Sequence, residues 1–219
     1  MGIDGPLGCN DPGLNSISVN IEKSLISERD NLALIDLDGT VADYNLEMRT
    51  RLAILKGPDE PDFVDRHDNL PSYILARRDL IKRQPGFWKN LPRLELGFEV
   101  VGFLKDAGFR LTTLTKCPQE IPEAWKEKIE WSLINLPDAQ YTLVSEDKSI
   151  VYGKILVDDY PPYFNAWLKV RPRGLVIAVA QPCNIGINQP NVIRYDGNNK
   201  AELIKLIEKV RKRTVRIHK

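Results

Sequence analysis

The sequence lacks an excess of charge of either sign. Across 219 residues, 31 lysines and arginines are balanced by 30 aspartates and glutamates, which leaves a formal net charge of +1 at pH 7. Proteins that bind nucleic-acid backbones through much of their surface usually carry a strong positive field. This charge balance does not favour nucleic acid as the main partner.

Cysteine is scarce, and its placement suggests neither a metal site nor a disulfide framework. The three cysteines, Cys9, Cys117 and Cys183, are widely spaced and form no CxxC pair. We therefore expect a reducing, intracellular setting. No apolar run has the length of a membrane span, and no basic stretch followed by an apolar one marks a secretory signal. These absences predict a soluble, cytoplasmic protein.

Short apolar runs bounded by turn residues alternate with helical patterns along the chain. The runs are 32–35, 109–115, 141–144, 155–157 and 175–180, and the helical patterns between them are 96–107, 121–136 and 163–170. Short, continuously apolar runs are typical of buried strands in parallel sheets. The alternation predicts an α/β fold with a doubly wound, mostly parallel, Rossmann-like sheet and right-handed crossovers.

The interval between the first two predicted strands is longer than one crossover helix needs. It holds helical stretches at 44–55 and 73–82, separated by a loop rich in proline and aspartate. We interpret 44–89 as a small helical cap, inserted after the first strand into a core made of 31–43 and 90–219. Residues 1–30, which show little periodicity, are predicted to be an N-terminal extension.

The final segment, 200–219, combines an apolar stripe with many basic residues. The apolar residues are Leu203, Ile204, Leu206, Ile207 and Val210, and the basic ones are Lys200, Lys205, Lys209, Arg211, Lys212, Arg213, Arg216 and Lys219. One interpretation is a terminal helix packed on the core with a solvated basic face. The other is a surface for nucleic acid or another anionic partner.

Two carboxylates follow the first predicted strand, where the sequence at 36–40 reads DLDGT. Ligands of open α/β sheets bind beyond the carboxyl ends of the strands, so Asp36 and Asp38 can both face one crevice. Gly39 permits a tight turn at this point. An ordinary Asp-Gly turn is the alternative, but aspartate disfavours strands, and two at a strand end call for a reason.

Polar residues also follow the later predicted strands. They are Thr115 and Lys116 after the second strand, Lys148 after the third, and Asp158 and Asp159 after the fourth. A parallel sheet would bring them beside Asp36, where the carboxylates would form the hard-oxygen cluster that Mg²⁺ prefers. Singly, each lysine could be solvated and the acidic pair could cap the next helix. Their joint order favours a site for a phosphate and a metal ion.

These motifs, taken in order, resemble the four motifs of the haloacid dehalogenase superfamily over roughly residues 31–180. A narrower resemblance is to the 5'(3')-deoxyribonucleotidase family. It rests on DLDGTVADY at 36–44, PGFWKNL at 85–91, AWKEK at 124–128 and Asp147-Lys148. Thr113, near Thr115, is an alternative for the second motif.

The resemblance implies a magnesium-dependent phosphatase that works through an aspartyl-phosphate. Asp36 is the expected nucleophile and Asp38 the expected general acid and base, so Asp38 should begin protonated. Lys148 would neutralise Asp36 and the phosphoryl oxygens, and the Thr115 hydroxyl would donate to a phosphoryl oxygen.

The resemblance also implies how the metal is held. Mg²⁺ is expected on the side chain of Asp36, the backbone carbonyl of Asp38 and the side chain of Asp159, with Asp158 close by. Magnesium prefers such a site of one or two carboxylates completed by waters and phosphate oxygens.

The substrate is expected to lie under the cap. The resemblance implies that Tyr44 and the Phe87/Trp88 pair hold a nucleobase by stacking, and Lys116 could add charge near the phosphate or sugar. The alternative is that these aromatic residues pack the cap onto the core.

The expected function is 5'-nucleotidase action on a (deoxy)ribonucleoside monophosphate. The alternatives are a phosphatase of another small metabolite, and a nucleic-acid-binding protein that uses the basic C-terminal segment. The sequence does not reveal the oligomeric state, so a homodimer stays open.

Overall fold

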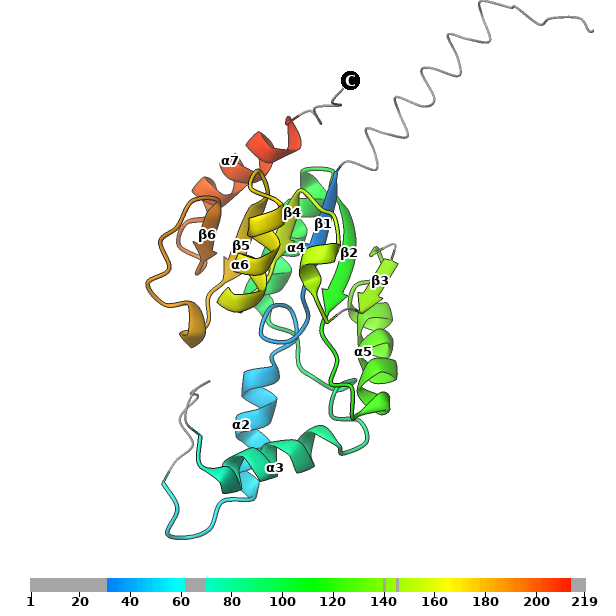
Figure 1. Ribbon diagram of the computed structural model, residues 1–219, viewed down its shortest axis with the longest axis vertical. Helices are drawn as coiled ribbons and strands as arrows, with labels where there is room; N and C mark the ends of the chain where they lie inside the picture. Colours follow the sequence, from blue (N-terminus) through cyan, green and yellow to red (C-terminus); the bar gives the residue numbers. More distant parts are fainter. Residues whose placement is uncertain (1–30, 62–69, 140, 145, 214–219) are drawn as a thin grey trace, which may run out of the picture.

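The computed structural model describes residues 31–61, 70–139, 141–144 and 146–213 (Figure 1). The predicted extension at 1–30, and Arg216 and Lys219 of the basic segment, lie outside the described residues. Within this part of the chain, no helix is both long enough and apolar enough to cross a membrane.

Six strands form one parallel sheet in the described residues. They are β1 (Leu32–Ile35), β2 (Arg110–Thr115), β3 (Tyr141–Val144), β4 (Ile155–Val157), β5 (Leu175–Val179) and β6 (Val192–Tyr195). Their order in the sheet is β3-β2-β1-β4-β5-β6, and every neighbouring pair is parallel. The order reverses beside β1, which is where such sheets bind ligands.

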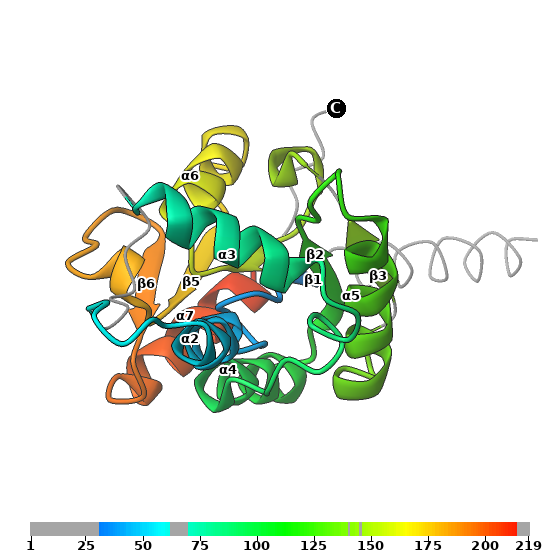
Figure 2. The same cartoon turned by 90° about the horizontal axis from the view of Figure 1, so that it is seen from below.

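Helices cover both faces of the sheet, as the predicted doubly wound fold requires. They are α4 (Glu95–Asp106), α5 (Pro122–Asn135), α6 (Pro161–Val170) and α7 (Lys200–Arg211). Figure 2 shows α4 and α7 on one face and α6 on the other. The central strand serves both faces: Ala33 and Ile35 join one buried cluster and Leu34 joins the other. This alternation follows from the two-residue period of a strand.

The edge strand β6 was not predicted. Its four residues, VIRY, alternate between half-buried and buried, so it shows no continuous apolar run of the kind seen in β1, β4 and β5. It pairs with β5 alone, as expected of a strand at the edge of a sheet. The hydroxyl of its last residue, Tyr195, donates to Glu99 of α4 at 2.5 Å, which ties β6 to the helix layer.

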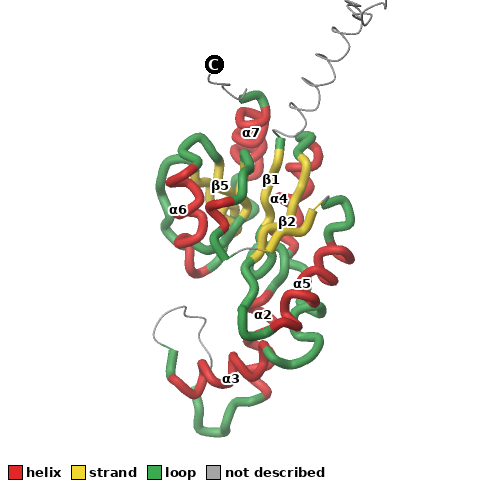
Figure 3. The backbone as a smooth tube through the Cα atoms, turned by 45° about the vertical axis from the view of Figure 1, so that its right-hand side comes forward, coloured by secondary structure: helices red, strands yellow, loops and turns green. Residues whose placement is uncertain are grey.

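Two helices lie apart from the sandwich, beyond the carboxyl ends of the strands (Figures 1 and 3). They are α2 (Tyr44–Ile54) and α3 (Ser72–Lys82), and they occur where the sequence predicted helices. The Asp43 carboxylate caps α2 by accepting from the backbone N–H of Leu46 at 3.0 Å. The two helices contact each other and stand over the end of the sheet where Asp36 lies.

The terminal helix α7 packs on the core through its apolar stripe. Leu203, Ile207 and Val210 are buried, whereas Lys205 and Lys209 are exposed. This arrangement matches the packed-helix interpretation of the segment. Whether its basic face binds an anionic partner stays a prediction.

Candidate active site

The loop after β1 is tightly folded and carries the first two carboxylates. The backbone N–H groups of residues 40, 41 and 42 all donate to the Leu37 carbonyl, at 3.1, 2.9 and 2.8 Å. Gly39 has a φ of +75°, a conformation that favours glycine. A Cβ at this position would lie 2.5 Å from Oδ2 of Asp159. Glycine is therefore required both for the turn and for the approach of the second acidic motif.

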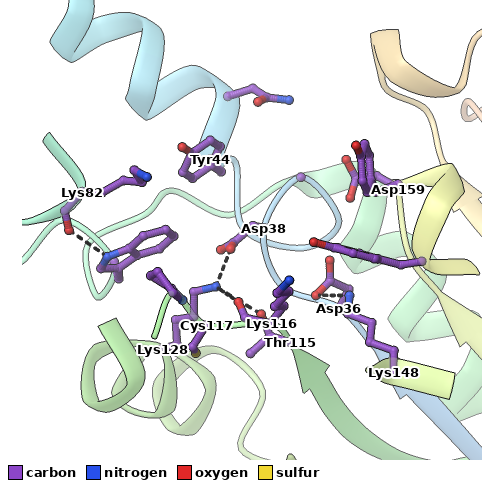
Figure 4. A pocket seen from close by; sticks show the side chains of 16 residues that line it. Asp36, Asp38, Tyr44, Lys82, Thr115, Lys116, Cys117, Lys128, Lys148 and Asp159 are labelled. Carbon is purple, nitrogen blue, oxygen red and sulfur yellow. Dashed lines mark hydrogen bonds and ion pairs between the residues drawn. The ribbon is translucent and has the colours of Figure 1, made fainter. Parts of the chain in front are cut away.

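Lys148 contacts two carboxylates, and Figure 4 shows it beside one of them, Asp36. Its Nζ contacts Oδ1 of Asp36 and Oδ2 of Asp158, each at 2.7 Å, and its side chain is 1 % exposed. Burial alone would lower the pKa of Lys148, but the carboxylates of Asp158 and Asp36 outweigh it and raise that pKa above its ordinary value. The ammonium group therefore stays charged beside Asp36.

Three carboxylates gather here, and their chemistry fits a hard divalent cation. Among the described residues, oxygens of Asp36, Asp158 and Asp159 lie within 4.8 Å of one another, and all three side chains are buried. Burial and the neighbouring carboxylates raise the pKa of Asp159 well above its ordinary value. Three buried carboxylates beside one lysine form an excess of negative charge that a cation such as Mg²⁺ would offset.

The two aspartates after β4, Asp158 and Asp159, differ in the contacts that their carboxylate oxygens make. Asp158 uses both oxygens, because Oδ2 contacts Lys148 and Oδ1 accepts from the backbone N–H of Tyr160 at 2.9 Å. Asp159 instead lines the cavity, and its Oδ1 accepts from the Thr40 hydroxyl at 3.3 Å. This difference favours Asp36 and Asp159 as metal ligands and gives Asp158 the task of holding Lys148.

Asp38 is paired with a second buried lysine, Lys128 of α5. Nζ of Lys128 contacts Oδ2 of Asp38 at 2.5 Å, while Oδ1 of Asp38 is buried with no hydrogen-bond partner among the described residues. Burial raises the pKa of Asp38, although Lys128 acts in the opposite direction. This direction agrees with an Asp38 that begins protonated.

Lys128 was not among the residues predicted for the site. It belonged only to the AWKEK stretch that carried the family resemblance. A signal was present in the periodicity, because Lys128 falls between Ala124 and Trp131 on the buried face of α5, where a charged residue requires a partner. Its partner lies 90 residues away in sequence, so only the tertiary fold identifies it.

A cavity of about 380 Å³ opens over these groups. Its lining residues are Asp36, Asp38, Gly39, Tyr44, Asn45, Lys82, Trp88, Thr115, Lys116, Cys117, Pro118, Lys128, Lys148, Asp159, Tyr160 and Tyr163. It thus brings together the ends of β1, β2 and β4 with residues of α2 and α3. Figure 4 shows the labelled side chains converging from these elements.

The predicted aromatic residues do not all reach this cavity. Tyr44 and Trp88 line it, with ring centroids 5.7 Å apart and planes inclined by 23°. Phe87 is fully buried, does not line the cavity and packs edge-on against both rings. The structure therefore supports the packing alternative for Phe87, and leaves Tyr44 and Trp88 as the candidates for contact with a base.

Of the two threonines that are candidates for the second motif, Thr115 is the one that lines the cavity. Thr115 and Lys116 line the cavity, whereas Thr113 does not, and its hydroxyl is buried without a partner among the described residues. The Thr115 hydroxyl lies 3.3 Å from Nζ of Lys128, and Nζ of Lys116 lies 5.7 Å from the centre of the Tyr163 ring.

A cysteine also faces the cavity, but it is poorly suited to act as a nucleophile. Burial raises the pKa of the Cys117 thiol to about 11, so the thiol stays protonated near neutral pH. Of the described cysteines, Cys117 and Cys183, both are free. The carboxylate of Asp36 is therefore the better candidate for covalent chemistry.

Two amide side chains from the loop after β5, those of Gln181 and Asn184, hydrogen-bond to the backbone of the two acidic motifs. Gln181 donates from Nε2 to the Gly39 carbonyl at 2.9 Å and accepts from Asn45 of α2 at 3.2 Å. Asn184 donates to the backbone carbonyl of Asp159 at 2.8 Å. These bonds, which the sequence did not reveal, connect α2 to both acidic motifs.

The chain matches one family model along most of its length. The family is described as 5' nucleotidase, deoxy (pyrimidine), cytosolic type C protein, and the match covers residues 30–213. No curated protein sequence matches the chain.

The structure is also similar to solved structures of low sequence identity. A protein from Clostridium difficile described as a phosphatase shares 15% identity, with 79% of this chain and 98% of that chain covered and a TM-score of 0.48. A haloacid dehalogenase-like hydrolase from Burkholderia xenovorans shares 14% identity, with 85% and 99% covered and a TM-score of 0.46. A HAD family hydrolase from Deinococcus radiodurans, solved with bound phosphate and sodium, shares 15% identity, with 81% and 87% covered and a TM-score of 0.43.

Proposed function

Because the chain belongs to the family described as 5' nucleotidase, deoxy (pyrimidine), cytosolic type C protein, we propose that it is a magnesium-dependent 5'-nucleotidase. Its substrates would be (deoxy)ribonucleoside monophosphates. The proposal is supported above all by the meeting of Asp36, Lys148 and Asp159 at one edge of the sheet, beneath a single cavity. Family membership makes the chain a phosphatase or nucleotidase of the haloacid dehalogenase type; the metal, the intermediate and the substrate are proposed.

In the first step, the Asp36 carboxylate attacks phosphorus. The new bond joins a carboxylate oxygen to phosphorus, and the bond between phosphorus and the ester oxygen breaks. The electron pair of that bond stays with the ester oxygen, which takes a proton from Asp38 and leaves as an alcohol. Lys148 stays beside Asp36 and balances charge on the phosphoryl oxygens, and the Thr115 hydroxyl can donate to one of them.

In the second step, water releases the phosphate. Asp38, now ionised, takes a proton from a water molecule while the water oxygen attacks phosphorus. The bond between phosphorus and the Asp36 oxygen breaks, and its electron pair returns to the Asp36 carboxylate. Both aspartates regain their starting states, and the net products are an alcohol and inorganic phosphate. Asp36 and Asp159 would hold the magnesium ion, whose charge offsets that of the phosphate when it is bound.

The nucleoside would lie between the catalytic edge and α2. Tyr44 and Trp88 offer flat rings to a base, and Lys82 and Lys116 add positive charge to the lining. A cytoplasmic location and the division into a cap at 44–89 and a core remain predictions from the sequence, and a homodimer stays open.

Phosphate release from a panel of esters tests the proposed substrate class. The panel contains deoxyribonucleoside and ribonucleoside monophosphates with 5' or 3' phosphates, sugar phosphates and p-nitrophenyl phosphate, each assayed with magnesium. We expect the highest kcat/KM with a nucleoside monophosphate. A strong preference for a sugar phosphate or another metabolite would overturn the nucleotidase proposal while retaining the chemistry.

The variant Asp36→Asn tests the nucleophile. It should lower kcat on the order of 1,000-fold or more, because the attacking carboxylate is lost while the fold stays intact. Wild-type enzyme quenched in acid with radiolabelled substrate should carry label that hydroxylamine removes, as an acyl phosphate requires, and Asp36→Asn should carry none. Substantial turnover by Asp36→Asn would remove Asp36 from this role.

A further inference from the structure

Lys128 is a buried lysine at the active site for which the mechanism above has no role. Only 2 % of its side chain is exposed. Its Nζ makes three polar contacts: to Oδ2 of Asp38 at 2.5 Å, to the Lys116 carbonyl at 2.6 Å and to the Thr115 hydroxyl at 3.3 Å. The same atom lies 4.5 Å from the centre of the Trp88 ring. One ammonium group thus contacts Asp38 of the first motif, Thr115 of the second motif and the ring of Trp88.

The helix that carries Lys128 is held firmly on both sides of it. The neighbouring Glu127 accepts from the backbone N–H groups of Gly86 and Trp88, at 2.6 and 3.0 Å. Trp131, one turn later, is buried and donates from its indole to the Leu91 carbonyl at 2.8 Å. Because its helix is anchored in this way, Lys128 can hold a second group in a fixed place.

The carboxyl group of Asp38 is held unequally. Lys128 takes Oδ2, whereas Oδ1 is buried and has no donor or acceptor among the described residues. A buried polar atom without a partner costs free energy and is rare in folded proteins. The Asp38 side chain is 26 % exposed although Oδ1 is buried, so its exposed surface belongs to other atoms, and the contact from Lys128 to Oδ2 fixes the direction in which the carboxyl group faces the cavity.

We propose that Lys128 is the positioning residue of the general acid: by holding Oδ2 of Asp38, it orients the carboxyl group so that its proton reaches the ester oxygen. The inference rests on the proposed phosphatase mechanism and adds to it a residue outside the four motifs. Lys128 does not bond to phosphorus or exchange a proton in this scheme. It acts through Asp38.

The leaving group reveals whether Lys128 acts in this way. Phenyl phosphate and p-nitrophenyl phosphate both carry a single aromatic ring and no nucleobase, but nitrophenolate leaves readily without a proton and phenolate does not. We expect Lys128→Met to lower kcat/KM for phenyl phosphate on the order of 100-fold, and to lower it for p-nitrophenyl phosphate by about tenfold at most. A purely structural lysine would affect both esters equally.

Three controls accompany this comparison. Lys126→Met changes an exposed lysine of the same helix and should keep wild-type kcat/KM with both esters. Thermal unfolding shows whether Lys128→Met is folded. If it is not, the same comparison is made with Lys128→Gln, whose shorter side chain keeps a hydrogen-bond donor. In an Asp38→Ala background, Lys128→Met should cost about twofold or less, because a residue that acts only through Asp38 has nothing left to position.

The outcomes separate this inference from the proposed function. A wild-type enzyme that hydrolyses neither ester nor any nucleotide would overturn both. Equal losses on the two esters, or a loss in the Asp38→Ala background as large as in wild type, would overturn the role of Lys128 alone. Unequal losses on the two esters, together with the absence of a further loss beside Asp38→Ala, support it.

Discussion

Phe87 and Trp88 are adjacent aromatic residues with different surroundings. Phe87 is fully buried, packs edge-on against Tyr44 and Trp88, and has the Arg51 guanidinium 5.4 Å from its ring centre. Trp88 is 4 % exposed, lines the cavity and donates from its indole to the Lys82 carbonyl at 3.0 Å. A single turn therefore contributes one ring to the core and one to the cavity.

Substitutions of Trp88 and Phe87 should separate contact with the substrate from packing of the core. Trp88→Ala should lower kcat/KM for a nucleoside monophosphate by about tenfold or more, since stacking on a base contributes ~1–3 kcal/mol. It should have less effect on a phosphate ester without a ring. Phe87→Leu should lower the free energy of unfolding by about 1 kcal/mol and leave the ratio of the two substrates unchanged. Equal losses on both substrates with Trp88→Ala would make Trp88 purely structural.

At the scale of elements, α4 lies close to the loop that follows β1. Gly97, in the first turns of this helix, faces the backbone of the loop after β1: a Cβ there would lie 1.8 Å from the Thr40 carbonyl oxygen and 3.1 Å from Cα of Val41. The loop is further fixed by a bond from the Leu94 N–H to the Val41 carbonyl at 2.8 Å. The start of α4 thus sets the position of the DLDGT turn.

Two glycines of this helix make a matched pair of tests. Gly97→Ala should destabilise the fold by about 3 kcal/mol, because the loop or the helix must shift to admit the methyl group, and activity should fall with it. Gly102→Ala, where no atom lies within 4 Å of the added Cβ, should instead stabilise the protein by about 0.5–1 kcal/mol. Denaturant unfolding and phosphate release measure both, and equal stability of the two variants would contradict the close approach.

For the whole molecule, the cluster around Lys148 places three carboxylates beside one ammonium group. Asp36, Asp158 and Asp159 are buried together, and Lys148 is the ammonium that contacts two of them. Like charges buried this closely repel each other and oppose folding in the absence of a cation. A bound divalent ion should therefore connect activity with the stability of the entire domain.

Magnesium should raise the melting temperature of the wild-type protein. The gain is about 2.7 kcal/mol when free magnesium is about 100 times its Kd, and chelation should remove it reversibly together with activity. Asp159→Asn should lose this response, and should be at least as stable as wild type with the chelator, because one buried negative charge is gone. The exposed variant Asp138→Asn should keep the response. A magnesium-induced shift retained by Asp159→Asn would remove Asp159 from the metal site.

The sequence alone determined the framework of this protein. Short apolar runs before Asp36 and Asp158 identified buried parallel strands, because a strand covered on both faces carries apolar residues without interruption. Since the carboxyl ends of parallel strands meet at one edge, the same runs predicted which polar residues come together. The edge strand β6 escaped prediction because its two faces differ in burial.

Only the tertiary structure decided which of the neighbouring candidates serve the site. Whether Phe87 or Trp88 faces the cavity depends on the direction of each side chain in a turn that Glu127 holds from another helix. The pairing of Lys128 with Asp38 likewise joins residues far apart in sequence through a distance of 2.5 Å. The periodicity of the sequence indicates which residues are buried. Which residue pairs with a buried charge depends on how the helices and strands pack, and only the tertiary structure shows that.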